Sequence, residues 1–491
     1  MMLRSIAAAL CAAPLLIATA GAHPGHDHAA PWDQASRWPD RIVVTPGEDP
    51  STSFSVTWRT DATVDEAVIQ FTKANADAAF DYGSMIDNAR VERVDLEGVR
   101  TPYGQTIAPN HGRGMVHSFS RTFADLEPST TYAYRVRGAR GHWSEWFHTR
   151  TAPATGPLDF LYFGDAQRGV HSHWSRMIRQ GVLTAPEADF ILHAGDLINR
   201  GHRDTEWAEW FDAGDFIHAM FPTIPVAGNH EHISTGPEGS RGGQSELTEL
   251  WRPHFTLPVE EELPDALHEA TYDIRYPSGL HVFVLDSSHV DWEVQMDWLV
   301  ETSRASDATW KIVALHHSPF RPGIAGRAYH ERRQQLFLRA ARRAGIDMVL
   351  AGHNHSYSRS SYGRDAGPGL QDNGARLILG DPREVEMAVV ISASGGMSGR
   401  LDAERFARGN ADFGDDLALE RWGHNTPTYQ HVEIDGPELR YTAYTALGDA
   451  YDAFTLEQID GRLVLTNGEA AFGDPRSYDN TGPRVDHDWL R

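Results

Sequence analysis

Five short apolar runs in this chain each end in residues that can bind a metal ion. The residues that follow the runs are Gly164-Asp165, Gly195-Asp196, Gly228-Asn229-His230-Glu231, His316-His317 and Gly352-His353-Asn354-His355. In open α/β sheets, ligand sites lie beyond the carboxyl ends of the strands. If the five runs are strands with a common edge, two aspartates, one asparagine and three or four histidines meet there.

These residue types suit a pair of metal ions. Carboxylate, amide oxygen and imidazole together favour first-row divalent or trivalent metals over Ca²⁺. Two ions about 3.5–4 Å apart can clamp a phosphate and lower the pKa of a shared water toward neutrality. The glycine before most of the ligands allows a sharp turn from strand to loop. A Gly-Asp pair alone is more often an ordinary turn or helix cap, so the prediction depends on the five motifs together.

The elements that must position these motifs begin at residue 158. Apolar runs alternate there with segments of helical period, as in a layered α/β domain. The expected strands are 158–163, 189–194, 223–227, 281–285, 311–315, 348–351 and 388–392, and the expected helices are about 171–183, 205–219, 293–305 and 330–344. From about residue 428 the runs are strand-like again, without a helical period.

Residues 40–152 predict a separate all-β domain. Segments 54–58 and 117–123 alternate apolar and polar residues, as half-buried strands do, and no helical period lies between them. This is the pattern of a β-sandwich. Residues 151–157 are rich in Pro, Gly and small side chains and predict a linker.

The net charge of -24 argues against a nucleic-acid partner or an anionic membrane surface. Residues 1–22 combine Arg4, an apolar run and Ala20-Gly21-Ala22, which predicts a signal peptide cleaved after Ala22. We therefore expect a secreted or periplasmic protein. The apolar run is too short to span a membrane, so no stable membrane anchor is expected. Residues 23–39 predict a His-rich, solvated tail.

The motifs resemble those of the calcineurin-like metallophosphoesterases, and among these the purple acid phosphatases. Gly228-Asn-His-Glu231 is similar to their GNHE motif, and Gly352-His-Asn-His-Ser-Tyr-Ser-Arg-Ser360 to GHxHxYxRS. Residues 126–136 resemble part of their N-terminal domain. The resemblance implies an N-terminal all-β fibronectin-III-like sandwich over 40–152 and an α/β metallophosphoesterase domain with two sheets in four layers over 158–460. It leaves 461–491 as a C-terminal extension.

The resemblance also implies two metal ions, with Fe, Zn or Mn as the expected metals. Its ligand set is Asp165 and His355 on the first metal, Asn229, His317 and His353 on the second, and Asp196 between them. We prefer His317 to His316 because it directly precedes Ser318-Pro319, as the ligand does in the family. By the same resemblance, His230 would lie beside the phosphate and assist the leaving oxygen, and His330 would lie on the substrate side.

Two positions depart from the family pattern. Asn199 stands where the purple enzymes have a metal-binding tyrosine, and Gln167 stands where many other members have a histidine. The side-chain oxygens of both residues are candidate ligands of the first metal. Without the tyrosine, no purple tyrosinate absorption band is expected.

Three arginines follow the motifs closely and are candidate substrate contacts, namely Arg168, Arg200 and Arg359. The expected activity is hydrolysis of phosphate monoesters on a small phosphorylated substrate, with a metal-bound hydroxide attacking phosphorus. The alternatives are a phosphodiesterase or phytase using the same centre, or a non-enzymatic binding protein in which the sandwich is the working part.

Overall fold

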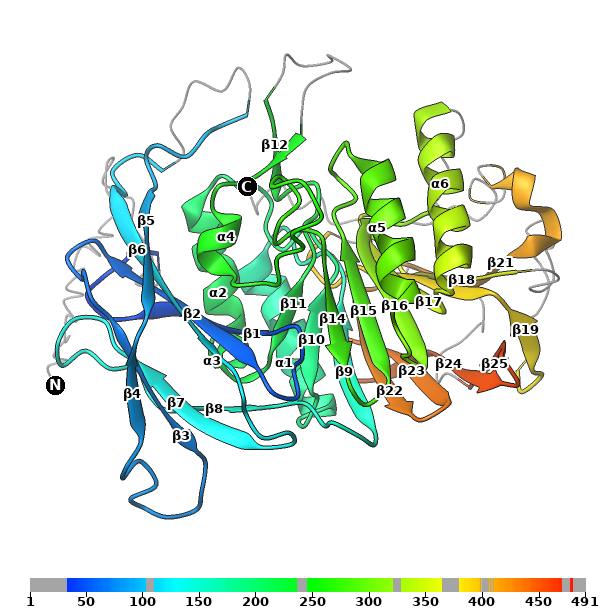
Figure 1. Cartoon of the computed structure of the whole chain (residues 1–491). Coiled ribbons are helices and arrows are strands. Elements are labelled where there is room, and N and C mark those ends of the chain that lie inside the picture. The colour runs from blue at the N-terminus through cyan, green and yellow to red at the C-terminus, as the bar shows by residue number, and fades with distance from the viewer. Residues whose placement is uncertain are drawn as a thin grey trace, which may run out of the picture.

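The computed structural model describes residues 33–102, 110–235, 245–320, 328–363, 379–397, 410–469 and 477–479, together with positions 399, 406 and 408. Two domains lie side by side, with the N-terminal domain in blue and cyan and the larger domain in green to red (Figure 1). The predicted signal peptide and the His-rich part of the predicted tail lie outside the described residues.

The N-terminal domain is the predicted β-sandwich. One sheet has the order β1 (Asp40–Pro46), β2 (Phe54–Asp61), β6 (Met115–Phe123), β5 (Arg90–Asp95), and the other has β4 (Met85–Asn88), β3 (Val68–Lys73), β7 (Thr131–Val136), β8 (Phe147–Arg150). Large apolar side chains such as Trp58, Phe119 and Tyr134 fill the space between them. Strand β2, predicted to be half-buried, is instead buried on both faces, because its outward-facing side chains meet the larger domain, as Thr57 does at Thr256.

The larger domain contains two eight-stranded mixed sheets. The first runs β11 (Thr223–Pro225), β10 (Phe190–His193), β9 (Leu158–Phe163), β22 (Thr428–Asp435), β23 (Glu438–Thr445), β24 (Ala450–Ile459), β25 (Arg462–Asn467), β19 (Arg383–Val385). The second runs β14 (Tyr272–Tyr276), β15 (Leu280–Leu285), β16 (Trp310–His317), β17 (Met348–Gly352), β20 (Met387–Ile391), β18 (Ser358–Tyr362), β21 (Leu417–His424), β26 (Ser477–Asp479). A short hairpin, β12 (His232–Ser234) and β13 (Ser245–Leu247), stands apart from both.

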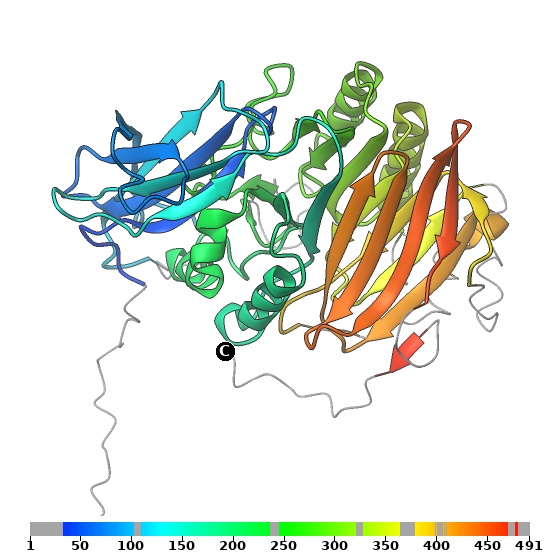
Figure 2. The ribbon, with the colours of Figure 1, turned by 90° about the horizontal axis from the view of Figure 1, so that it is seen from below.

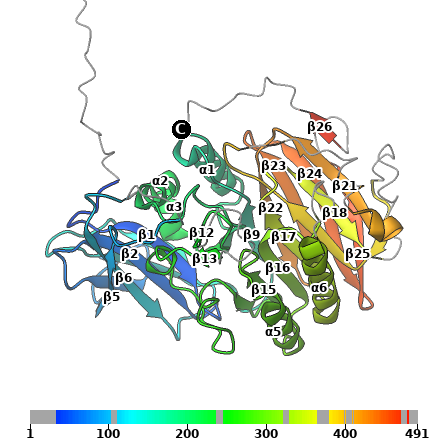
Figure 3. The ribbon, with the colours of Figure 1, turned by 90° about the horizontal axis from the view of Figure 1, so that it is seen from above.

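Helices complete the predicted four layers. Helices α5 (Trp292–Arg304) and α6 (Ala328–Ala344) cover the second sheet, and the orange strands β22 to β25 lie on the other side of that sheet (Figures 2 and 3). Helix α1 (Ser175–Thr184), which follows a π-helical turn at Val170–Trp174, packs on β9 and β22. Helices α2 (Asp204–Gly214), α3 (Phe216–Met220) and α4 (Trp251–His254) lie beside the sandwich.

Two boundaries differ from the sequence prediction. The expected helix at 205–219 is divided into α2 and α3 at Asp215, which has a φ of 48° that no α-helix can continue through. The domain does not end at residue 460, because β25 pairs with both β24 and β19 and so belongs to the first sheet. Among the described residues, no helix has the length and apolar character to cross a membrane.

Candidate metal centre

The carboxyl ends of parallel strands from both sheets meet at one place, as the sequence predicts. Strands β9 and β10 are parallel neighbours in the first sheet, and β16, β17 and β20 are parallel neighbours in the second. An isolated bridge between Asp165 and Ala393 joins the two edges. The metal-binding motifs therefore converge from two sheets, which is why their spacing along the chain is so wide.

Two groups of potential ligands form at this edge, and both contain Asp196. One group is Asp196, His316 and His353, and the other is Asp165, Asp196 and His355; within each group the ligand atoms all lie within 4.8 Å of one another. Because a carboxylate has two oxygens, Asp196 can contact an ion on each side. The predicted bridging position of Asp196 agrees with this geometry.

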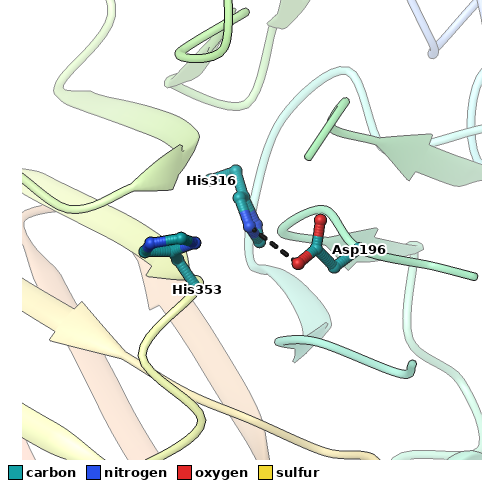
Figure 4. A group of neighbouring side chains, drawn as sticks. All are labelled: Asp196, His316 and His353. Atoms are coloured by element: carbon teal, nitrogen blue, oxygen red, sulfur yellow. Dashed lines mark ion pairs between the residues drawn. The ribbon is translucent and has the colours of Figure 1, made fainter. Parts of the chain in front are cut away.

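The Asp196–His316–His353 group surrounds the side chain of Asn229. Asn229 Oδ1 lies 3.1 Å from His316 Nε2 and 2.8 Å from His353 Nδ1. His316 Nδ1 donates to the carbonyl of Ala194 at 2.8 Å, which turns Nε2 toward Asp196 Oδ2, 3.1 Å away (Figure 4). A backbone acceptor that fixes the tautomer in this way is typical of metal-binding histidines.

His316, and not His317, occupies the predicted place in this group. The two residues are neighbours at the irregular end of β16, where their ring centroids lie 5.1 Å apart and both rings pack near that of His353. The His316 side chain is fully buried at the centre, whereas His317 Nδ1 lies 2.9 Å from the hydroxyl of Ser287. The β16–β17 pairing shifts between Ala314 and His317, and this irregularity decides which histidine faces the centre. The prediction of His317 as the ligand is corrected on this geometry.

The Asp165–Asp196–His355 group contains buried oxygens that lack a hydrogen bond. Asp165 Oδ2 lies 3.1 Å from His355 Nε2 without an aligned hydrogen bond, and Gln167 Oε1 has no partner among the described residues. Gln167 Nε2 donates to Asp196 Oδ2 at 2.8 Å. Buried polar atoms are normally paired. A cation at this place would satisfy both oxygens, so the donor set fits a metal ion.

The charges of the centre also fit a cation. Burial works against ionised Asp196, but the His316 and His230 side chains prevail and lower its pKa to about 2. Burial alone would lower the pKa of His316, but the Asp196 and Asp165 carboxylates raise it to about 10. Both shifts come mainly from the attraction between the Asp196 carboxylate and the His316 imidazolium, which stabilises the charged form of each.

The backbone around the centre is held in unusual conformations. Asp196, His353 and His355 have φ values of 50°, 73° and 49°, in the left-handed region that L side chains rarely adopt. Such strain collects at ligand-binding sites, where the surroundings enforce it. Gly228 and Gly352 are required for a different reason, since a Cβ on either would come within 2.4 Å of Asp196 Oδ1 or Asp165 Oδ1.

Glu231 has a role that sequence reasoning missed. Its fully buried carboxylate accepts hydrogen bonds from the amides of Gly228, Asp196 and Leu197 at 2.7–2.9 Å. It therefore holds the two ligand loops together without touching a metal position. Its position as the last residue of the Gly-Asn-His-Glu motif is the sequence feature that could have pointed to this role.

His230 lies at the rim of the centre, as predicted. Its Nδ1 donates to the backbone carbonyl of Asn199 at 2.5 Å, because a carbonyl can only accept, and its Nε2 lies 3.9 Å from Asp196 Oδ2. The side-chain oxygen of Asn199 accepts from Arg168 Nε at 3.2 Å. The structure thus turns this oxygen toward Arg168 and does not bring it into either ligand group.

The remaining predicted residues fall in different places. Arg168 is exposed at the rim, and Arg200 is exposed beside it with Nε 3.3 Å from Glu206. Arg359 contradicts the prediction, because its side chain is fully buried and its guanidinium pairs with Asp452 between the two sheets. It cannot contact a substrate. His330 belongs to α6, but its side chain lies outside the described residues.

Comparison with known proteins identifies both domains. Residues 158–357 match the calcineurin-like phosphoesterase family, and residues 39–151 match the N-terminal domain of the purple acid phosphatases. A solved structure of a purple acid phosphatase from yellow lupin seeds has a TM-score of 0.63 at 16% identity, covering 86% of this chain and 74% of that chain. The similarity confirms the predicted pairing of sandwich and metallophosphoesterase fold.

Curated relatives are distant and longer than the matched part. Purple acid phosphatase 21 of Arabidopsis thaliana is 27% identical over 272 residues, or 52% of this chain and 56% of that protein. Fe(3+)-Zn(2+) purple acid phosphatase 12 of the same plant is 27% identical over 271 residues, or 51% and 53%. The chain spans about half the length of the curated relatives it matches.

Proposed function

We propose that this chain is a secreted two-metal hydrolase of phosphate monoesters. Residues 158–357 match the calcineurin-like phosphoesterase family and residues 39–151 match the N-terminal domain of the purple acid phosphatases, and both matches support the proposal. The observation that carries the proposal is the position of Asp196, which is shared by two groups of ligand atoms. A carboxylate between two ions is the arrangement that lets two metals act on one phosphate.

The geometry supports one ligand set. Asp165, Gln167 and His355 would hold the first ion, Asn229, His316 and His353 would hold the second, and Asp196 would bridge them. When bound, the ions stabilise developing negative charge and acidify water. Fe, Zn or Mn suit this set, and a relative is named for Fe(3+) and Zn(2+). With Asn199 in place of the tyrosine, an iron-loaded sample should lack a tyrosinate band.

The chain's own residues supply orientation and a proton. His230 Nδ1 donates to the Asn199 carbonyl, which turns Nε2 toward the centre. In the imidazolium form Nε2 carries the second proton, which it can donate to the leaving oxygen. Arg168 is exposed at the rim, where its guanidinium can contact a phosphate oxygen.

The test is a comparison of substrates on protein loaded separately with Mn²⁺, Zn²⁺ and Fe. An aryl phosphate should be hydrolysed faster than a bis-aryl phosphate or phytate. A faster diester would make the protein a phosphodiesterase, and faster phytate would make it a phytase. If no substrate is hydrolysed with any metal, the remaining alternative is a non-enzymatic binding protein. Mass spectrometry of exported protein should find an N-terminus at His23, and retention of residues 1–22 would contradict secretion.

A further inference from the structure

The N-terminal sandwich contacts the larger domain at Asp204, a few residues beyond the proposed bridging ligand Asp196. Asp204, the first residue of α2, is buried and receives three guanidinium groups from the sandwich. Arg41 Nη1 lies 2.6 Å from its Oδ1, and Arg59 and Arg113 lie 3.2 Å and 3.0 Å from its Oδ2. Arg41 itself has a φ of 52° at an irregularity in β1, so the backbone accepts strain to aim this side chain.

A fourth residue of the N-terminal domain, Asn110, binds the backbone of the same loop. Its Nδ2 donates to the carbonyl of His202 at 3.0 Å, and its Oδ1 accepts from the amide of Asp204 at 2.9 Å. Asn110 is buried, and both ends of its amide are used. These contacts fix the path of residues 202–204 as well as holding α2.

From this point hydrogen bonds lead directly to His230. The amide of Gly201 donates to the carbonyl of His230 at 2.7 Å, and the carbonyl of Asn199 accepts from His230 Nδ1 at 2.5 Å. A Cβ on Gly201 would lie 2.8 Å from the Glu231 carbonyl, so this loop is in close contact with the ligand loop. Residues 199–204 are therefore held between the sandwich on one side and His230 on the other.

A purely structural role would be docking of the two domains. Buried ion pairs contribute little net stability, because desolvation offsets their attraction. Docking also has other contacts far from the loop, such as Tyr134 Oη donating to the Ala219 carbonyl at 2.6 Å. Docking alone does not require Asn110 to bind backbone groups on both sides of Arg203. The contacts of Asn110 are those expected of a residue that sets the course of a loop.

We propose that the N-terminal domain is part of the catalytic apparatus, with Asn110 and the Asp204–arginine cluster acting as positioning residues that hold loop 199–204 and thereby orient His230 toward the leaving group. The proposal rests on the proposed function, in which His230 donates a proton to the leaving oxygen. Esters whose leaving group needs no proton should therefore be hydrolysed at an unchanged rate when His230 is misoriented.

The experiment compares Asn110→Ala with Tyr134→Phe, which removes one buried interdomain hydrogen bond of similar kind far from the loop. Each variant is assayed as the metal-loaded full chain on an alkyl phosphate and on a dinitrophenyl phosphate, with kcat and KM separated. General acid assistance contributes roughly 10²–10⁴-fold to rate. We expect Asn110→Ala to lower kcat on the alkyl ester about tenfold or more, with little change on the dinitrophenyl ester, in KM or in metal content.

Tyr134→Phe should leave the ratio of the two rates unchanged. Two results would overturn the proposal in favour of simple docking. One is an equal loss of kcat on both esters in Asn110→Ala, and the other is the same change in the ratio of the two rates in both variants. If Asn110→Ala does not fold, Asn110→Ser, which keeps a hydroxyl near the Asp204 amide, replaces it.

Hydrogen exchange of the backbone amides supplies a measurement independent of activity. Asn110→Ala should speed exchange at Gly201 and Asp204, and unchanged exchange at both would contradict the proposal. If wild-type protein hydrolyses no monoester, the proposed function fails while exchange still decides whether Asn110 holds the loop. The two failures are therefore distinguishable.

Discussion

Two of the buried clusters of charged side chains in the larger domain differ in how completely their polar atoms are hydrogen-bonded. Around Arg359 the guanidinium donates to both oxygens of Asp452 at 2.7 Å and 2.9 Å and to Asn467 Oδ1 at 2.8 Å. Tyr357 adds a hydrogen bond to Asp452. At the metal centre, by contrast, Asp165 Oδ2 and Gln167 Oε1 are buried without a hydrogen bond among the described residues.

The difference separates a structural cluster from a functional one. Arg359 lies on β18 of the second sheet, while Asp452 and Asn467 lie on β24 and β25 of the first, so this cluster ties the sheets together. The metal centre instead combines unpaired oxygens with left-handed ligand residues. Strain and unpaired polar atoms persist where a ligand or a reaction uses them.

The largest effect is expected from Asp196→Asn. Loss of the shared carboxylate charge should weaken both ions, each of which supplies several kcal/mol of transition-state stabilisation. At about 1.4 kcal/mol per factor of ten, kcat should fall on the order of a thousandfold or more. Asp212→Asn, at a half-buried α2 carboxylate that pairs with His171, is the matched control and should keep both metal content and rate. Full metal content with a normal rate in Asp196→Asn would show that the residue does not bridge.

Arg359→Met should affect stability and leave the chemistry unchanged. Removing one partner of a buried pair leaves Asp452 charged and uncompensated, which costs about 3–5 kcal/mol. Urea unfolding of the metal-free protein measures this loss, and the double variant Arg359→Met/Asp452→Leu should recover most of it. A variant of unchanged stability but reduced substrate affinity would restore the sequence-based assignment of Arg359 to the substrate site.

Arg359 and His316 show where prediction from the sequence reached its limit. Strands 158–163, 311–315 and 348–351 and four helices were predictable because apolar period and motif position agree. The direction of one side chain was not, since a pairing irregularity in β16 selects His316 over its neighbour. Arg359 follows the last motif closely along the chain, but β18 carries it away from the metal centre into the space between the sheets.

Contacts between segments far apart in the chain also could not be predicted from the sequence. Asn110 binds residues 92 and 94 positions away, and Arg41 pairs with Asp204, 163 positions away. No local pattern marks such pairs, because each residue alone is compatible with an exposed loop or strand. The candidate ligands could be found from motifs, whereas the residues that support them could be found only from the fold.

Gln167→Ala should moderately weaken the binding of the first metal ion only. Its amide contacts Asp196 and His355, so the first ion should bind about tenfold or more weakly, as when a supporting residue of a metal site is removed. The second ion should be retained. Metal titration of the variant against Asn199→Ala provides the comparison, because the Asn199 oxygen already accepts from Arg168. Equal weakening by the two substitutions would show that Asn199 is also a ligand.

The smallest effect is expected at Glu206, whose charge is only partly compensated. Its Oε2 is buried without a partner, and burial outweighs Arg200 and Arg203 to raise its pKa to about 6. The folded state therefore retains a proton that the unfolded state releases between about pH 4.5 and 6, so stability falls as the pH rises through this window. Glu206→Gln should gain about 1 kcal/mol at pH 7, after allowance for partial exposure, and nothing at pH 4. Thermal unfolding of both proteins at pH 7 and pH 4 measures this gain in stability. An equal gain at both pH values would show that the ionisation of Glu206 is not its cause.

The central claim is that two ions share Asp196, and anomalous X-ray diffraction from metal-loaded crystals tests it most directly. We expect two anomalous peaks about 3.5–4 Å apart, with Asp196 in contact with both and His316 in contact with one. A single peak, or two peaks with Asp196 bound to only one of them, would contradict the account.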